Sequence, residues 1–255
     1  VVGLCHSVQA IPQIFGQTLG LDPENVRFRA HGLNHQAWVT EATYQGRDIY
    51  DDFRTALGRR FPSPSEQPPV PWAEALQHHK VKTTVDHMSH YLYENVRAEV
   101  MRMTGYFHTE SSHHGSEYCP WFRKDKATID GYIPKRWDYY QRCLDHDPEE
   151  QERWTKEKAA MPEIPRSSEY GAFILDAIET NTPYIFHGNV PNWGQLGAKS
   201  DHQNGLLIPN LPSNACVEVA CVADETGIQP TAPGELPTVC AAMNRLMVNV
   251  QELTV

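Results

Sequence analysis

The first residues with chemical potential in this chain are the adjacent pair Cys5 and His6. Apolar residues follow them at helical spacing and Gly20 stands where a C-terminal cap belongs, so the pattern predicts a helix over residues 5–19. Cys5 would then lie at the helix N-terminus, where the helix dipole and free backbone N–H groups stabilise a thiolate. Such a thiolate is a candidate metal ligand or nucleophile, although a buried cysteine with a purely structural role also explains the residue.

A second group, His31-Gly32-Leu33-Asn34-His35, stands at the end of a predicted strand. His35 is a candidate metal ligand, and Asn34 is a candidate for orienting a substrate hydroxyl. The competing interpretation is an ordinary surface or core histidine, which is the commoner reason for a single His beside a strand end.

A third group is the run His108 to Tyr118, HTESSHHGSEY, in which every residue except Gly115 has a polar side chain. Aromatic residues border it on both sides, and polar groups between aromatic walls are typical of a sugar site. We expect this run to form an irregular loop. A zinc site here, or at His78-His79 or His87 and His90, has weak support because no Cys or carboxylate set of the usual spacing accompanies the histidines.

The elements that must hold these groups mix strands with helices. Strands are predicted over residues 26–44, through Ile49-Tyr50 and within 184–224, where Val217, Val219 and Cys221 alternate. Helices are predicted over 81–104 with Gly105 at the end, from Asp147, over 167–181 and from Leu236. The fold class is therefore α+β. Gly188, Gly194 and Gly197 lack the spacing of a dinucleotide-binding fingerprint.

Composition narrows the class of protein. The chain has 255 residues and a net charge of −10, which disfavours nucleic acid as a partner because phosphate binding needs a basic face. No run of 18 apolar residues occurs, so no membrane span is expected. The six cysteines are scattered, which favours reduced thiols in a cytoplasmic protein over a disulfide framework, and we do not expect Cys216 and Cys221 to pair.

Four segments closely resemble glycoside hydrolase family 4, in the right order and over most of the chain: GLCHSV from Gly3, GLNH from Gly32, TESSHHGSEYCPWF from Thr109, and the block from Asn189 to Val219. Cys-His-Ser-Val resembles the α-galactosidase (melibiase) subgroup. The 6-phospho-glycosidase subgroups carry Asp or Asn after the Cys, so His6 argues against a phosphorylated sugar.

The resemblance implies that residues 1–255 are the C-terminal catalytic and metal-binding domain of such an enzyme. The implied fold is that of the second domain of lactate and malate dehydrogenases, with antiparallel sheets packed against helices. Family members carry an NAD-binding Rossmann domain ahead of the Cys motif, and we expect it to be absent from this chain.

The implied reaction is redox-assisted elimination, without the usual pair of catalytic carboxylates. NAD⁺ takes a hydride from C3 of the sugar, Mn²⁺ chelates the oxygens on C2 and C3, a base removes the C2 proton, and the aglycone leaves. The hydride then returns after water adds.

Carried over by motif, Cys5 and His35 are the metal ligands and Tyr118 is the base that removes the C2 proton, with Tyr106 as the alternative. His6 acts as the leaving-group acid or binds the sugar. Asn34 contacts the substrate or supports His35. Trp121 and Trp193 are candidate stacking walls, although core packing explains them equally well.

Other interpretations stay open. An α-galacturonidase or α-glucuronidase of the same family fits if Arg123 and Lys124 face a uronate, and a catalytically inactive metal-binding fragment fits a chain without an NAD site. A lactate or malate dehydrogenase lacks support because the Cys-His motif has no role there. The expected partners are a small-molecule glycoside and, by resemblance, further copies of the chain in a homo-oligomer.

Overall fold

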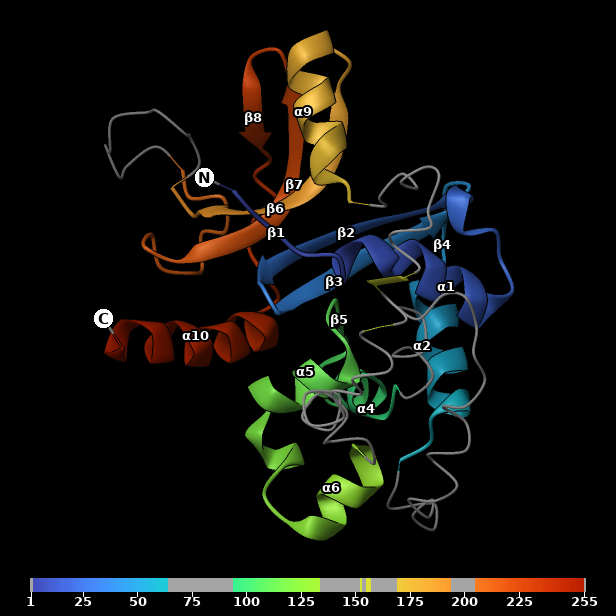
Figure 1. Cartoon of the computed structure of the whole chain (residues 1–255). Coiled ribbons are helices and arrows are strands. Elements are labelled where there is room, and N and C mark those ends of the chain that lie inside the picture. The colour runs from blue at the N-terminus through green and yellow to red at the C-terminus, as the bar shows by residue number, and fades with distance from the viewer. Residues whose placement is uncertain are drawn as a thin grey trace.

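An antiparallel sheet organises the part of the chain described by this computed structural model, which comprises residues 2–63, 94–133, 152, 155–156, 169–193 and 205–254 (Figure 1). Its eight strands follow the order β1-β6-β7-β2-β3-β4, with β5 paired to β3 and β8 paired to β7. The strands are β1 (Gly3–Leu4), β2 (Val26–Leu33), β3 (Gln36–Tyr44), β4 (Arg47–Asp48), β5 (Phe107–His108), β6 (Tyr184–Pro191), β7 (Cys216–Asp224) and β8 (Gly227–Pro230).

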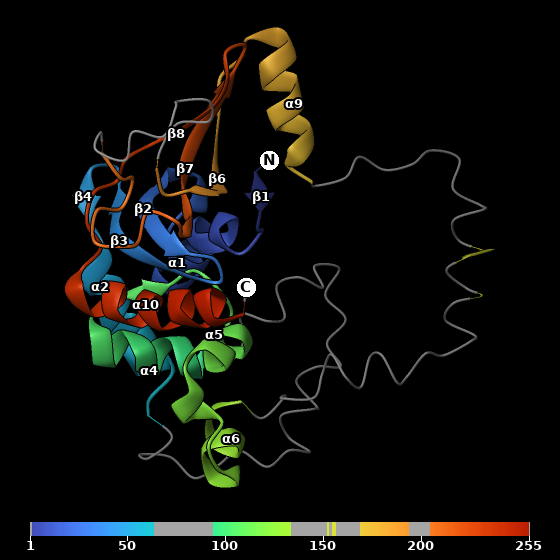
Figure 2. The same ribbon diagram turned by 90° about the vertical axis from the view of Figure 1, so that its left-hand side faces the viewer.

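Helices pack against this sheet at several points. α9 lies along β6 and β7, and α10 contacts β2 (Figure 1). α4 packs with α2 and α5 at the opposite end of the molecule from α9 (Figures 1 and 2). Their bounds are α1 (Ile11–Leu19), α2 (Tyr50–Arg60), α4 (Asn95–Thr104), α5 (Ser112–Tyr118), α6 (Lys126–Tyr132), α9 (Gly171–Thr180) and α10 (Thr238–Leu253). Short 3-10 helices are η1 (Val8–Ala10), η2 (Pro23–Asn25) and η6 (Pro120–Phe122).

Two apolar cores support the sheet. The larger core gathers β6, β7, α9 and α10 around side chains such as Phe186, Val217 and Val219. The smaller core joins α1 and α2 to β2 and β3, and there Phe15 and Phe53 stack with their ring centroids 3.6 Å apart. Both cores end at the β2–β3 hairpin, so burial on two sides fixes this hairpin in place.

The β2–β3 hairpin is tightly packed near its turn. Leu33 pairs with Gln36, which leaves Asn34 and His35 as the turn residues. Gly32 has φ 145°, and a Cβ there would lie 2.9 Å from Cα of Ala37, so only glycine fits without displacing backbone. The close packing of this strand end holds the turn residues in a defined position.

Some predicted elements differ from the structure. The helix predicted over residues 5–19 starts later, with η1 and then α1, so Cys5 lies in the connection before it and not at its N-terminus. Ile49 and Tyr50 form no strand, since β4 ends at Asp48 and α2 follows at once. The run from residue 107 is not an irregular loop, because it forms β5 and α5.

Other predicted elements are confirmed. Gly20 and Gly105 cap α1 and α4 with left-handed backbone, and Val217, Val219 and Cys221 are buried along β7. Cys216 and Cys221 are free thiols. The predicted helix start at Asp147, residues 81–93, and the His78-His79 and His87/His90 groups lie outside the described residues.

The last predicted helix exists as α10, but it buries Cys240, Ala241, Asn244 and Val248. Leu246 and Val250 are each 55% exposed, so some of the apolar side chains of α10 face outward. No helix among the described residues is both long enough and apolar enough to cross a bilayer.

Two buried histidines lie at the centre of the sheet, and one of them leads to a pH prediction. Burial lowers the pKa of His187 to about 4, with the neighbouring His31 as a smaller cause, from an ordinary value of 6.5. Between pH 4 and 6.5 the unfolded chain binds a proton at this histidine and the folded chain does not. The free energy of unfolding therefore decreases as the pH is lowered from 6.5 toward 4.

We expect the variant His187→Phe, which can keep the ring stacking on Phe28, to lose less stability than the parent chain over this pH range. The difference in slope should approach about 1.4 kcal/mol per pH unit for one proton. Urea unfolding at several pH values between 4 and 7 measures it. Equal slopes for the two proteins would contradict this assignment.

Candidate metal centre

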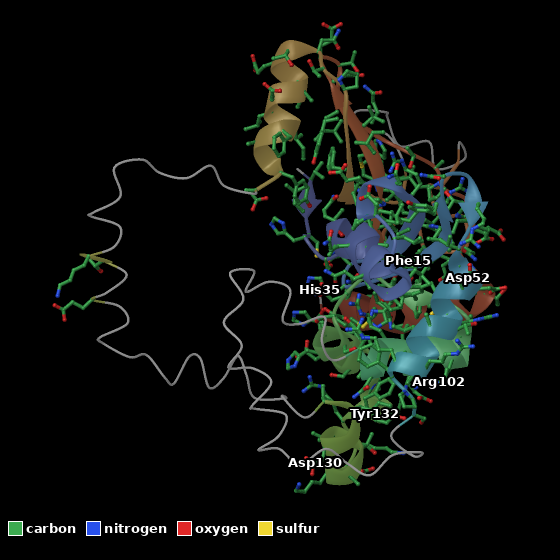
Figure 3. The ribbon with its side chains drawn as sticks, turned by 90° about the vertical axis from the view of Figure 1, so that its right-hand side faces the viewer. Phe15, His35, Asp52, Arg102, Asp130 and Tyr132 are labelled. Atoms are coloured by element: carbon green, nitrogen blue, oxygen red, sulfur yellow. The ribbon has the colours of Figure 1, made fainter. Side chains whose placement is uncertain are left out.

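Three segments that are far apart in the sequence meet beside the β2–β3 turn. Cys5 follows β1, His35 occupies the turn, and Glu110 lies between β5 and α5. Their ligand atoms all lie within 4.8 Å of one another. Oε2 of Glu110 is 3.7 Å from Sγ of Cys5 and 3.9 Å from Nε2 of His35. Figure 3 labels His35 at one margin of the folded body, away from Asp52 and Arg102.

Ser7 links two of these groups. Its Oγ lies 3.0 Å from Sγ of Cys5, and its side chain also hydrogen-bonds the Glu110 carboxylate. Burial is the largest influence on the Cys5 thiol and raises its pKa, with bonds from Ser7 and Asn34 acting the other way. The pKa of Glu110 is lowered, because hydrogen bonds from Ser111 and Ser7 and the nearby His35 outweigh the opposing effect of its burial. The cluster therefore holds an ionised carboxylate beside a thiol that needs a cation to ionise readily.

A buried ion pair holds the segment that carries Glu110. The guanidinium of Arg97 makes two hydrogen bonds to Glu94, and its Nη1 donates to the carbonyl oxygens of His108 and Thr109 at 3.4 and 3.3 Å. Arg97 is fully buried and Glu94 is 2% exposed. Because these carbonyls directly precede Glu110, the ion pair fixes the backbone that presents its carboxylate to the site.

The same arrangement anchors the start of α5. The hydroxyl of Ser112 donates to Glu94 at 3.1 Å, and Ser111 caps the helix by accepting a hydrogen bond from the backbone N–H of His114. Gly115 is needed one turn later, since a Cβ there would lie 2.4 Å from the ring of the buried His108.

α5 brings Tyr118 to the metal-ligand cluster. The phenol oxygen of Tyr118 lies 3.4 Å from Nδ1 of His35, and His114 stacks on the other side of the His35 ring with centroids 5.0 Å apart. Burial, followed by the carboxylates of Glu117 and Glu110, raises the pKa of Tyr118. Tyr106, the alternative from the sequence, packs instead against the larger core.

Asn34 and His6 are the other two candidate residues beside the cluster of Cys5, His35 and Glu110. Nδ2 of Asn34 donates to Oε1 of Glu218 at 3.0 Å. Nε2 of His6 lies 3.0 Å from Oε2 of Glu169, and its ring meets Tyr170 edge-on at 5.2 Å. The Tyr170 hydroxyl in turn donates to the carbonyl of Cys5 at 2.9 Å, so α9 contributes to the position of the Cys5-His6 segment.

All five residues selected from the sequence therefore gather in one region, although Cys5 is not at a helix end. Sequence reasoning missed Glu110 and Glu218. Glu110 stood inside the polar run from residue 108, where it was treated as one polar group among many, and Glu218 was hidden within an alternating apolar strand. Of the two tryptophans, Trp121 packs against the larger core and Trp193 is 40% exposed.

The donor set indicates the kind of ion that would fit. A thiolate, an imidazole and a carboxylate together suit a borderline divalent transition metal better than calcium or magnesium, which prefer oxygen ligands alone. Three protein ligands also leave coordination positions for substrate oxygens, as in catalytic metal sites.

Comparison with known proteins gives a consistent assignment. A model of the family 4 glycosyl hydrolase C-terminal domain matches residues 30–255. An alignment with an α-galactosidase from Bacillus subtilis (strain 168) has 34% identity and covers 100% of this chain and 50% of the relative. An α-galactosidase from Rhizobium meliloti (strain 1021) is 30% identical, with 100% and 46% covered. An α-galacturonidase from Lachnoclostridium phytofermentans is 24% identical, with 92% and 47% covered. The chain spans about half the length of these relatives.

Solved structures support the fold. A 6-phospho-α-glucosidase from gut microorganisms, in complex with NAD and Mn²⁺, superposes with a TM-score of 0.60 at 17% identity, covering 98% of this chain and 52% of the other. A 6-phospho-β-glucosidase from Thermotoga maritima, with manganese, NAD⁺ and glucose-6-phosphate, gives a TM-score of 0.54 at 14% identity, with 99% and 48% covered. The predicted α+β fold of the lactate/malate dehydrogenase C-terminal type is confirmed.

The cluster predicts metal binding that depends on Glu110 as well as on Cys5. We expect Cys5→Ser to abolish the thiolate-to-cobalt absorption band, because the thiolate itself is removed. We expect Glu110→Gln to weaken Co²⁺ binding by at least about tenfold, since even partners outside the ligand shell matter this much. The thiolate-to-cobalt absorption band of the purified chain reports the titration.

Two variants serve as matched controls. Cys216→Ser removes an exposed free thiol, and Glu99→Gln removes a carboxylate that pairs with Arg102 elsewhere. Both should bind as the parent chain does. Unchanged affinity in Glu110→Gln would exclude that carboxylate from the ligand set.

Proposed function

Since this chain belongs to glycosyl hydrolase family 4, we propose that it is the C-terminal, metal-binding half of a glycosidase that cleaves α-galactosides with Mn²⁺ and NAD. The observation that carries the proposal is the convergence of Cys5, His35 and Glu110 beside Tyr118. These are the two ligands and the base that the family motifs imply, with one further carboxylate.

The galactoside assignment rests on two supports. The curated relatives at 34% and 30% identity are α-galactosidases, whereas the α-galacturonidase relative is at 24%. In addition, the guanidinium of Arg123 donates to Ser116 at 2.9 Å and lies 3.6 Å from Glu117. A cation already engaged in this way is poorly placed to bind a uronate.

The metal is proposed from the fit of the donor set. Cys5 and His35 would hold the ion, with Glu110 as a third ligand. The protein neighbours solved with manganese support Mn²⁺, and the thiolate would also accept zinc. When bound, the divalent cation supplies Lewis-acid stabilisation of the negative charge that develops on sugar oxygens.

Tyr118 is proposed as the base that takes the C2 proton. Its phenol oxygen lies 3.4 Å from Nδ1 of His35, and its raised pKa means that it is protonated at neutral pH without a nearby cation. A cation held by Cys5 and His35 would lie close to this phenol and would favour the phenolate form that can take a proton. The base therefore needs the ligand cluster to be assembled before it can act.

His6 and Asn34 are proposed to bind the sugar, with His6 also giving a proton to the leaving group. The ring of His6 is accessible and is oriented by Glu169 and Tyr170. Carboxylate–histidine pairs fix which ring nitrogen carries the proton. With its Nε2 proton donated to Glu169, the ring presents Nδ1 to a ligand, where the neutral form would accept a hydrogen bond from the sugar and the imidazolium form would give its Nδ1 proton to the leaving group.

NAD would supply reversible hydride transfer. Among the described residues no strand–turn–helix with the Gly-rich spacing of a dinucleotide site occurs, so no step is assigned to NAD within this chain. We propose that an NAD-binding domain outside these residues completes the active site. The exposed apolar side chains of α10, with Leu253 at 87%, support the homo-oligomer proposed for the whole protein.

The test of function is hydrolysis of a nitrophenyl α-galactoside by the full-length protein, with Mn²⁺ and NAD⁺ omitted in turn. We expect activity to vanish on each omission. Activity without either cofactor would overturn the proposed mechanism, whereas cleavage of the corresponding galacturonide alone would replace only the substrate. Metal binding without activity on either sugar would favour a catalytically inactive metal-binding protein.

Tyr118 and Tyr106 provide a matched pair for testing the base. Tyr118→Phe should lower kcat by about 10²–10⁴-fold, because it removes proton transfer, and should leave metal affinity unchanged. Tyr106→Phe should retain activity. Deuterium uptake at C2 of the product in D₂O measures the proton step directly, and normal uptake in Tyr118→Phe would show that another group is the base.

A further inference from the structure

Glu218 is a buried carboxylate for which neither the motifs nor the proposed reaction gives a role. It lies on β7 opposite Gly32 of β2, and its side chain is fully buried. Oε1 accepts the hydrogen bond from Asn34, while Oε2 has no hydrogen-bond partner within the described part of the chain. A buried carboxylate with so few partners costs stability, so its presence calls for a functional explanation.

Asn34 connects this carboxylate to the metal-ligand cluster. Its amide nitrogen lies 3.0 Å from Oε1 of Glu218, and a side-chain hydrogen bond from Asn34 also favours the thiolate form of Cys5. An amide nitrogen has two N–H groups, so one can point at Glu218 and the other at the sulfur. The amide oxygen is then directed away from both.

We propose that Glu218 is a positioning residue that keeps the nitrogen of the Asn34 amide, and not its oxygen, turned toward the sulfur of Cys5. A carboxylate can only accept, so it selects one of the two amide orientations. This inference rests on the proposed metal site. Its physical consequence is that the thiolate ligand receives an N–H donor, while a flipped amide would set an oxygen lone pair against it.

The burial of Glu218 has a measurable cost. Its pKa is raised to about 7, chiefly by desolvation and also by the charge of Glu110, while the hydrogen bond from Asn34 and the charge of His35 oppose the rise. Tyr170 is a further titratable group that interacts with it. Above that pH the ionised group destabilises the fold, because the unfolded chain ionises at 4.5 without this penalty. A neutral isostere should therefore raise stability at pH 8 while removing the orienting charge.

The test compares Glu218→Gln with the parent chain at pH 8, using Co²⁺ alone as the probe. We expect thermal unfolding of the metal-free variant at a higher temperature. The thiolate-to-cobalt band should reach saturation only at a Co²⁺ concentration on the order of ten- to a hundredfold higher, which is typical when a partner of a ligand is lost. If Glu218 had only a structural role, its substitution would not raise the unfolding temperature while it weakens Co²⁺ binding.

Glu252→Gln is the matched control, because Oε1 of Glu252 also accepts from an asparagine, Asn214, at 3.0 Å but on exposed α10. Neither property should change there. Asn34→Ala should weaken Co²⁺ binding as Glu218→Gln does, and the double variant should add little, because both changes remove one interaction.

Three outcomes would overturn the inference. The first is that Glu218→Gln binds Co²⁺ as tightly as the parent chain. The second is that Glu218→Gln loses thermal stability as well as Co²⁺ affinity. The third is that Glu218→Gln weakens Co²⁺ binding as strongly in the Asn34→Ala background as in the parent chain. If the parent chain itself gives no thiolate band, or Cys5→Ser leaves the band unchanged, the proposed metal site fails instead.

Discussion

The buried ion pair between Arg97 and Glu94 is the interaction on which the site geometry depends. It joins α4 to the backbone at His108 and Thr109 and to the first turn of α5, and the segment from β5 to the end of α5 carries Glu110 and Tyr118. Charges removed from water in this way are stable only when each polar atom is matched, and breaking such a pair costs about 3–5 kcal/mol. Here the carboxylate of Glu94 is satisfied by the guanidinium and by Ser112, while the face of the guanidinium lies 4.5 Å from the centroid of the Phe107 ring. Because the charged groups of this buried pair have these partners, the backbone that presents Glu110 is held rigidly.

The other half of the cluster is held by sheet register. A strand alternates its faces, so a shift by one residue in β2 would turn His35 to the wrong side of the hairpin. Gly32 prevents such a shift because no other residue fits against Ala37, and Asn244 of α10 donates to the carbonyl of Gln36 at 2.8 Å from the far side. The imidazole is thus positioned by the sheet and the carboxylate by a helix pair, and the two meet only when the whole domain is folded.

The sequence located the residues of the candidate site better than it predicted the local structure around them. Cys5, His35 and Tyr118 could be selected because their motifs carry them together, and α+β class followed from mixed periodicities. The helical nature of residues 112–118 was hidden, since polar residues on a seven-residue helix give no apolar stripe to recognise. Glu110 and Glu218 were not recognisable as site residues either, because their roles arise from contacts with residues that are more than 100 positions away in the chain. Likewise, the start of α1 depends on how β1 joins the edge of the sheet, which periodicity does not encode.

The contacts of Ser7 give physical meaning to the tetrapeptide that suggested the galactoside subgroup. Its hydroxyl contacts both the sulfur of Cys5 and the carboxylate of Glu110, which are themselves 3.7 Å apart and would repel each other once both are ionised. A hydroxyl has a single proton, so it can donate to only one of these groups at a time and must accept from, or merely contact, the other. Together with Asn34, which donates from the opposite strand end, it surrounds the thiol with hydrogen-bonding groups before any cation arrives. The contacts of this serine are therefore with two groups of the candidate metal centre, Cys5 and Glu110.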